Sequence, residues 1–247
     1  MELRRIFLEN VSYENNLLRL NPETSKRIFK VLRLIKGKLI EVFWDNENNY
    51  IAEIANIKNR YVYLKLKEKI NKSLIEEKIS IAQCILKSNR MDWLIEKITE
   101  IGISDFYPII SQYTLFKNNE NVNYKMLRWK KIMISAVEQS GKCSLPILHE
   151  IKLFNEAIVD LSNKYDIIFF CNKAKNSYDI TLEMVNKKIK KGNIMLFIGP
   201  EGGFSLQEAE LAKKNNALVV SLPNFILRSE TIAIIALAIA KYIKKLY

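Results

Sequence analysis

Residues 194–208 read IMLFIGPEGGFSLQE and join an apolar run, a glycine-rich segment and a helix-start signal. The first five of these residues, Ile194–Ile198, are typical of a buried strand. Three of the seven glycines in the chain follow immediately. Ser205 and Glu208 then have the Ser-x-x-Glu spacing of a capping box, which predicts that a helix begins there. Strand, glycine loop and helix form the arrangement with which open α/β sheets bind ligands at the carboxyl ends of their strands.

The same alternation extends over the C-terminal two thirds of the chain. Helical spacing of apolar residues occurs over Met91–Ile101, with Gly102 placed to end the helix, and again over Tyr124–Gln139. Helical patterns such as these separate strand-like runs at Ile79–Leu86, Ile103–Ile110, Asp166–Cys171, Ile194–Ile198 and Leu218–Leu222. The alternation predicts an α/β domain with a mainly parallel sheet over residues 73–247.

The N-terminal third has a different pattern. Three runs rich in Ile, Val, Tyr and Phe, at Lys38–Trp44, Tyr50–Ala55 and Arg60–Leu66, predict a small β-domain. The first 75 residues carry a net charge of +6 and the remaining 172 also carry +6, so the charge density of the first third is about twice as high. The segment Lys67–Lys78 is charged and weakly periodic, so we place the domain boundary near residue 72.

Composition excludes several classes of protein. The 247 residues hold 39 Lys and Arg against 27 Asp and Glu, which gives a net charge of +12 and favours a polyanionic partner such as nucleic acid. One histidine, His149, and three cysteines without a Cys-x-x-Cys pair argue against a zinc site, a disulfide framework and a Ser-His-Asp triad. The longest apolar stretch, Thr231–Ala240, is about half the roughly 20 residues that cross a bilayer. We expect a cytoplasmic protein.

The glycine loop and an arginine near the C-terminus are the candidate site. Glycine lets the backbone approach a ligand closely, and Glu201 would oppose a phosphate, so a neutral or cationic ligand suits the loop. A tight turn that simply requires glycine is the alternative. Arg228 falls near the first turn of the C-terminal helix, where a cation opposes the helix dipole, so it is either held by an anion or used in chemistry. An ion pair with Glu201 or Glu230 is the structural explanation.

Six motifs in order along the chain together resemble one known family. They are Arg5-Ile6-Phe7; Val31-Leu32-Arg33 with Gly37; Lys87 with Arg90–Lys97 and Thr99–Gly102; Glu138-Gln139-Ser140; Ile198–Phe204; and Ile226–Thr231. The sequence is similar to the bacterial 16S rRNA (uracil-N3)-methyltransferases, the RsmE family of the SPOUT (trefoil-knot) methyltransferases. The resemblance covers essentially the whole chain.

The resemblance implies an N-terminal PUA-like β-barrel that binds RNA (residues 1–72) and a C-terminal SPOUT methyltransferase domain (residues 73–247). This second domain would have a mainly parallel sheet and a deep C-terminal trefoil knot. It also implies S-adenosylmethionine as cofactor, a homodimer, no metal, and 16S rRNA or the small ribosomal subunit as partner. The implied cofactor-binding residues are Phe170, Ile198, Gly199, Glu201, Gly202, Gly203, Leu222, Phe225 and Leu227. The candidate RNA-binding residues are Arg5, Arg27, Lys30, Arg33, Lys87, Arg90 and Lys142.

For such a reaction the uracil N3 proton must leave, and negative charge then spreads to O2 and O4. Arg228 is the candidate catalytic residue that stabilises this charge, because a guanidinium stays protonated in proteins. The proton acceptor is left open between Glu230, the second catalytic candidate, Glu138 and water. Two other functions stay open as well: a non-catalytic RNA-binding assembly factor, and a SPOUT methyltransferase that acts on another RNA base.

Overall fold

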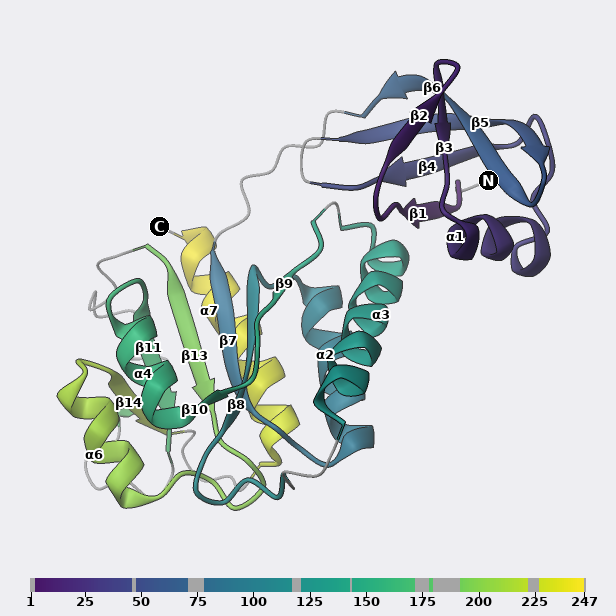
Figure 1. Cartoon of the computed structure of the whole chain (residues 1–247). Helices are drawn as coiled ribbons and strands as arrows, with labels where there is room; N and C mark the ends of the chain where they lie inside the picture. The colour runs from purple at the N-terminus through teal and green to yellow at the C-terminus, as the bar shows by residue number, and fades with distance from the viewer. Residues whose placement is uncertain are drawn as a thin grey trace. The chain divides into compact units, whose positions relative to one another are not determined.

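The computed structural model describes residues 3–45, 48–70, 78–116, 121–142, 144–171, 178–179, 192–221 and 227–246. Two compact units make up the chain. The first comprises Met1–Ile75 with Val137–Leu145, and the second comprises Glu76–Ala136 with Pro146–Tyr247 (Figure 1). The boundary predicted near residue 72 lies within 71–77, outside the described residues.

The first unit is built on a six-stranded mixed sheet in the order β1-β4-β5-β6-β3-β2. Its strands are β1 (Arg5–Phe7), β2 (Ser12–Glu14), β3 (Leu17–Arg19), β4 (Leu39–Phe43), β5 (Asn49–Lys58) and β6 (Tyr61–Lys69). The predicted β-domain is confirmed, but no pairing joins the edge strands β1 and β2 in the described part of the chain. Each edge strand has only three residues, and what is observed is an open sheet, not a closed barrel.

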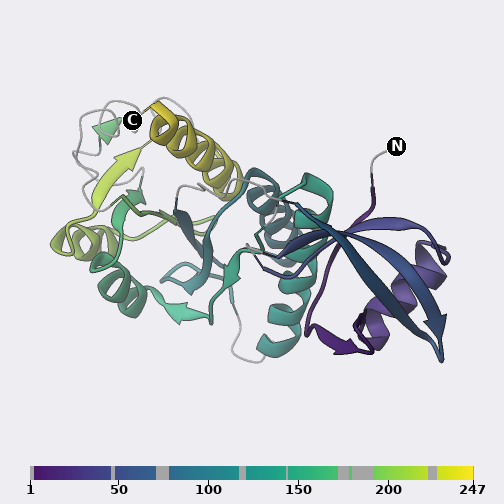
Figure 2. The same ribbon diagram turned by 90° about the horizontal axis from the view of Figure 1, so that it is seen from above.

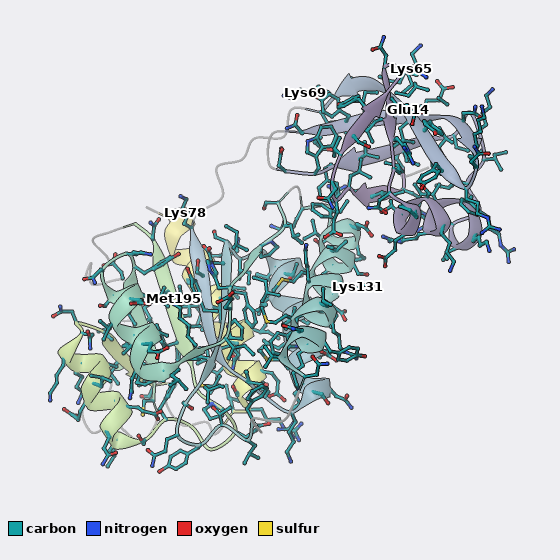
Figure 3. All side chains as sticks on the ribbon, in the orientation of Figure 1. Glu14, Lys65, Lys69, Lys78, Lys131 and Met195 are labelled. Carbon is teal, nitrogen blue, oxygen red and sulfur yellow. The ribbon has the colours of Figure 1, made fainter. Side chains whose placement is uncertain are left out.

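Alternation along β6 shows how this sheet forms its core. Val62 and Leu64 are fully buried, while Lys65 and Lys69 are exposed (Figure 3). The short helix α1 (Pro22–Lys26) begins at Asn21, whose side chain accepts a 2.8 Å hydrogen bond from the Thr24 amide. It leads into the π-helix η1 (Arg27–Val31), which adds Ile28 to the same core.

An ion pair within the first unit joins residues far apart in the sequence. The Arg27 guanidinium donates two hydrogen bonds to the Glu138 carboxylate, one of them 2.9 Å long, and the Phe7 amide donates a third at 2.9 Å. The Glu138 side chain is only 6% exposed, so it depends on these donors for its charge. The carboxylate raises the pKa of Arg27, mainly through the hydrogen bond between them.

The second unit has an eight-stranded sheet in which every recorded pairing is parallel. Its order is β10-β8-β7-β13-β11-β14-β12, with β9 paired to β8. The strands are β7 (Ile79–Cys84), β8 (Asp105–Ile110), β9 (Ile147–Leu148), β10 (Lys152–Leu153), β11 (Asp166–Phe170), β12 (Tyr178–Asp179), β13 (Ile194–Ile198) and β14 (Leu218–Ser221). The predicted mainly parallel sheet is confirmed. The strand before the glycine loop, β13, lies at its centre and is buried along its whole length.

Helices cover both faces of this sheet (Figures 1 and 2). On one face α7 (Ser229–Leu246) packs on β7 and β13 and against α2 (Ser88–Ile101). On the other lie α4 (Phe154–Ser162) and α6 (Leu206–Lys214), and the unit also contains most of α3 (Val122–Ser140). The predicted helix end at Gly102 is confirmed, since this residue closes α2 with φ 98°. Among the helices that the structure describes, none is both long and apolar enough to cross a membrane.

Arg27→Ala should destabilise the first unit, because it leaves the buried Glu138 carboxylate without its cation. We expect a loss of about 1–3 kcal/mol in the free energy of unfolding, the range for an unsatisfied buried group. Urea unfolding followed by circular dichroism measures it. Lys30→Ala is the control, since Lys30 is exposed and forms no ion pair with any residue that the structure describes. Equal stability of the two variants would contradict a structural role for Arg27.

Candidate functional site

A cavity of about 340 Å³ opens at the carboxyl end of β13. Five segments of the second unit line it: Arg90 from α2, the end of β11, the glycine loop after β13, residues 227–228 and the start of α7. Its lining residues are Arg90, Phe170, Cys171, Ile198–Phe204, Leu227–Ser229 and Ile232. Apolar walls with a few charged groups at the rim are typical of a small-molecule site.

Close packing of backbone on backbone shapes the glycine loop. A Cβ on Gly199 would lie 3.1 Å from the carbonyl carbon of Gly203 and 3.2 Å from the Phe204 ring, too close for an ordinary side chain. Gly203 has φ 72°, which favours glycine, and its amide donates to the Pro200 carbonyl at 2.9 Å. The loop therefore requires glycine at its first and last positions for different reasons.

The predicted capping box at the start of α6 is confirmed and fixes the far end of the loop. The Ser205 amide donates to Glu208 Oε2 at 2.8 Å, and the Glu208 amide donates to Ser205 Oγ at 3.2 Å. The other Glu208 oxygen accepts a 2.9 Å bond from the Gln112 amide, at the carboxyl end of β8. The loop is thus tied to β8, which lies two strands away from β13 in the sheet.

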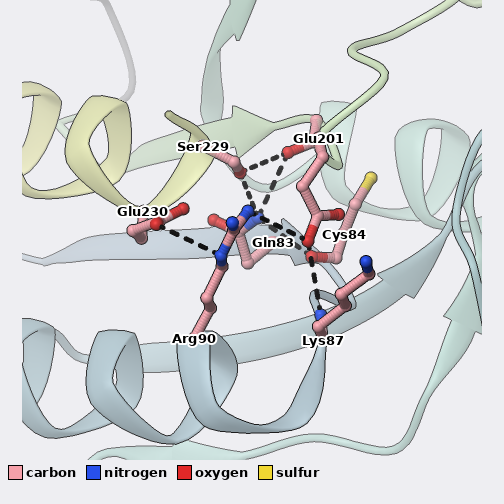
Figure 4. A network of polar contacts seen from close by, with 8 residues as sticks. Gln83, Cys84, Lys87, Arg90, Glu201, Ser229 and Glu230 are labelled. Carbon is pink, nitrogen blue, oxygen red and sulfur yellow. Dashed lines mark hydrogen bonds and ion pairs between the residues drawn. The ribbon is translucent and has the colours of Figure 1, made fainter. Parts of the chain in front are cut away.

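A buried amide that the sequence analysis missed holds the near end of the loop (Figure 4). Gln83 on β7 is fully buried, and its Nε2 lies 2.9 Å from Ser229 Oγ and 3.3 Å from the Gly199 carbonyl oxygen. Ser229 Oγ also donates to the Gly199 carbonyl. The available signal was a glutamine inside a mostly apolar strand.

Arg90 lies between two carboxylates at the rim of the cavity (Figure 4). Its Nη1 is 3.6 Å from Glu201 Oε1, and its Nε is 3.8 Å from Glu230 Oε1. Glu201 Oε1 also accepts a long, 3.5 Å contact from the Lys87 amide. The Glu230 side chain is 9% exposed, and its Oε2 is buried without a hydrogen-bond partner among the described residues. The charge of Arg90 is therefore largely compensated by its neighbours.

Arg228 differs from Arg90 in both exposure and partners. It is exposed, lines the cavity, and has no side-chain ion pair or hydrogen bond among the residues that the structure describes. The ion pairs considered from the sequence, with Glu201 or Glu230, are formed by Arg90 instead. Arg228 is thus a cation available to an anion in the cavity.

Neither the Cys84 thiol nor the His149 imidazole lines the cavity. Burial raises the pKa of the Cys84 thiol well above its ordinary value, so this cysteine stays protonated and inert. His149 is bonded to Asp105 through a 2.8 Å contact and stacks on Tyr107, at the amino-terminal end of β8. No group of three or more His, Cys, Asp or Glu side chains could hold a metal ion within the described ranges.

The cavity gathers most of the predicted cofactor-binding residues. Phe170, Ile198, Gly199, Glu201, Gly202, Gly203 and Leu227 all line it. Leu222 and Phe225 lie outside the described residues. Of the catalytic candidates, Arg228 lines the cavity. Glu230 is not among the lining residues and lies next to Arg90, which is.

The predicted RNA-binding residues fall into different environments. The Arg5 side chain is 8% exposed and donates to the Val137 and Lys142 carbonyls, so it stabilises the first unit, as Arg27 does. Lys30 and Arg33 are exposed, but η1 ends at Val31 and Arg33 has φ 52°, so the two side chains do not lie on one helix. In the second unit Lys87 is exposed and Arg90 belongs to the cavity, while Lys142 in the first unit is half-buried.

Comparison with known proteins identifies relatives along the whole chain. The RNA methyltransferase domain family matches residues 74–241. A ribosomal RNA small subunit methyltransferase E of Buchnera aphidicola (subsp. Schizaphis graminum) is 30% identical over 97% of this chain and 96% of its own. The protein of that name from Rickettsia conorii is 28% identical over 96% and 95%. A putative methyltransferase of Legionella pneumophila, solved with bound cofactor SAM, superposes with a TM-score of 0.87 at 27% identity over 98% of both chains.

Gly199→Ala should displace the loop, because the added methyl group meets backbone atoms that cannot rotate away. We expect a loss of about 1–3 kcal/mol in the free energy of unfolding, the usual cost of overpacking. Thermal or urea unfolding measures it. Leu206→Ala, at a 60% exposed position at the start of α6, should change stability by less than about 0.5 kcal/mol. Gly199→Ala with wild-type stability would show that the loop relaxes freely.

Proposed function

Because the chain belongs to the RNA methyltransferase family, among the ribosomal RNA small subunit methyltransferases E, we propose that it methylates 16S rRNA at N3 of a uridine, with S-adenosylmethionine as donor. The observation that carries the proposal is the cavity at the carboxyl end of β13, which is lined both by the glycine loop bearing Glu201 and by Arg228. The Legionella relative was solved with this cofactor bound.

The residues present fit S-adenosylmethionine. The cofactor is a sulfonium cation with an apolar methyl group and an aromatic base, so it suits a cavity that combines carboxylate with apolar surface. Glu201 supplies the carboxylate, and Phe170, Ile198 and Leu227 supply apolar walls. Gly199 lets the loop fold back tightly on itself, because a Cβ there would meet Gly203 and Phe204 of the same loop. Gly202, Gly203, Leu222 and Phe225 complete the proposed cofactor-binding set.

S-adenosylmethionine supplies a methyl group already activated for transfer, so the protein has mainly to align the acceptor and make it nucleophilic. Loss of the N3 proton leaves negative charge on the uracil oxygens. Arg228 stabilises that charge, since its guanidinium has no competing carboxylate among the described residues. Arg90 keeps a positioning role at the rim, because two carboxylates already compensate its charge.

The neighbours of the two candidate acid groups limit what each can do. Glu138 accepts three hydrogen bonds inside the first unit, and Glu230 lies behind Arg90 with one oxygen buried. We therefore propose that solvent water accepts the N3 proton and that Glu230 orients Arg90. A direct catalytic role of Glu230 stays a prediction.

We further propose that residues 1–72 form a PUA-like RNA-binding domain and residues 73–247 a SPOUT methyltransferase domain with a C-terminal trefoil knot. Exposed lysines and arginines of both parts, Lys30, Arg33 and Lys87, are the proposed phosphate contacts. Trp93, Tyr124 and Leu127 are 47%, 61% and 61% exposed on α2 and α3, which supports a homodimer that buries them. Action on ribosomal RNA would support a cytoplasmic location.

The direct test of the function is incubation of the protein with methyl-labelled S-adenosylmethionine and small-subunit rRNA, followed by mass analysis of the modified nucleosides. We expect 3-methyluridine. Label on another base would make the protein a methyltransferase of different specificity. Calorimetric heat with RNA but none with S-adenosylmethionine would instead indicate an RNA-binding assembly factor.

Arg228→Ala should slow methyl transfer by about 10²–10³-fold, the effect of deleting one oxyanion donor. Cofactor affinity, measured by calorimetry, should fall much less, because the donor carries its own positive charge. Arg228→Lys should recover part of the rate, since it keeps the charge without the planar fork. Equal losses in rate and cofactor affinity would assign Arg228 to binding.

A further inference from the structure

We propose that Gln83 is a positioning residue for methyl transfer, acting through the carbonyl group of Gly199. This inference rests on the proposed function. Gln83 is fully buried in β7 and does not line the cavity. Its side chain links the two segments that carry the reacting groups: the glycine loop and the start of α7 (Figure 4).

Three acceptors surround one nitrogen. Gln83 Nε2 lies 2.9 Å from the Cys84 carbonyl oxygen, 3.3 Å from that of Gly199 and 2.9 Å from Ser229 Oγ. Two carbonyl oxygens cannot donate, so the amide must present its NH₂ group here and not its oxygen. Ser229 Oγ accepts from the amide and donates to the same Gly199 carbonyl. Gln83, Gly199 and Ser229 therefore form a closed triangle of hydrogen bonds.

This triangle sets the spacing across the cavity. Gly199 is two residues before Glu201, on the side of the cofactor, and Ser229 directly follows Arg228, on the side of the uracil. A shift of either segment relative to the other changes the distance between methyl group and acceptor. A misplacement of about 1 Å can cost about 10²-fold in rate.

Stability alone does not account for a glutamine at this position. Gln83 Oε1 is buried and has no hydrogen-bond partner among the residues that the structure describes. Every other member of β7 is also fully buried, and most are apolar. A buried amide whose oxygen has no hydrogen-bond partner is costly in such a strand. Its nitrogen, in contrast, has three acceptors, and two of them, on Gly199 and Ser229, belong to residues that line the cavity. The placement is that of a group retained for what it orients.

The experiment compares Gln83→Leu with Ser80→Ala, a matched control on the same strand. Ser80 is fully buried, and its hydroxyl donates to Asp105 at 3.0 Å, away from the cavity. Both variants lose buried hydrogen bonds of β7, but only Gln83→Leu releases the Gly199 carbonyl. We expect kcat of Gln83→Leu to fall about 10–100-fold with a much smaller change in KM for S-adenosylmethionine, and kcat of Ser80→Ala to stay near wild type.

A second pair of variants tests the same triangle from α7. Ser229→Ala removes the hydroxyl and should lower kcat, while Ser229→Thr retains a hydroxyl and should recover it. The double variant Gln83→Leu with Ser229→Ala should lose less than the product of the single losses, because both act on one carbonyl. The two single Ser229 variants decide the question even if Gln83→Leu folds poorly.

Three results would overturn the proposal: a kcat for folded Gln83→Leu equal to that of Ser80→Ala, multiplicative losses in the double variant, or no recovery with Ser229→Thr. Failure of the proposed function is a separate outcome. In that case the wild-type protein itself would neither bind S-adenosylmethionine nor methylate RNA.

Discussion

The candidate site depends on one steric constraint: the backbone must fold back on itself directly after the central strand. At Gly199 the chain passes within van der Waals distance of Gly203 and the Phe204 ring. Phe204 is buried and stacks on Phe169 of β11, with ring centroids 4.3 Å apart, and it also contacts Phe154 of α4. Phe204, which lines the cavity, therefore packs directly on the aromatic core, and this close packing makes the loop as rigid as the sheet.

Two arginines share the cavity, and their neighbours give them different roles. Arg90 is placed by α2 between Glu201 and Glu230, so it closes the rim and adds little net charge. Arg228 precedes α7 and keeps its charge available. The positive end of the α7 dipole adds to the field of Arg228 and strengthens attraction for an anion in the cavity. A site that holds a cationic donor and an acceptor that becomes negative needs two different cations. The charge of one, Arg90, is compensated by carboxylates, and the charge of the other, Arg228, can attract the acceptor.

Local signals made much of this architecture predictable. The strand, loop, capping box and helix of residues 194–208, and the helix end at Gly102, follow from spacing within a few residues. Gln83 could not be assigned in this way, because its partners Gly199 and Ser229 lie 116 and 146 positions away. Arg27 was a candidate RNA-binding residue, and its pairing with Glu138, 111 positions away, could not be assigned from local spacing either. Composition reveals charge but not whether a carboxylate from a distant segment neutralises it.

The strand order has a consequence for how the protein is made. β7 is synthesised early, but its central neighbour β13 follows about 110 residues later, so one edge of a mostly apolar strand waits for a distant partner. At translation speeds of about 5–20 residues per second, this interval lasts roughly 5–20 s. Until then β7 can pair only with β8, and the exposed edge is open to wrong partners. The nascent chain therefore passes through an aggregation-prone stage that the finished sheet conceals, and shielding by chaperones matters most during those seconds.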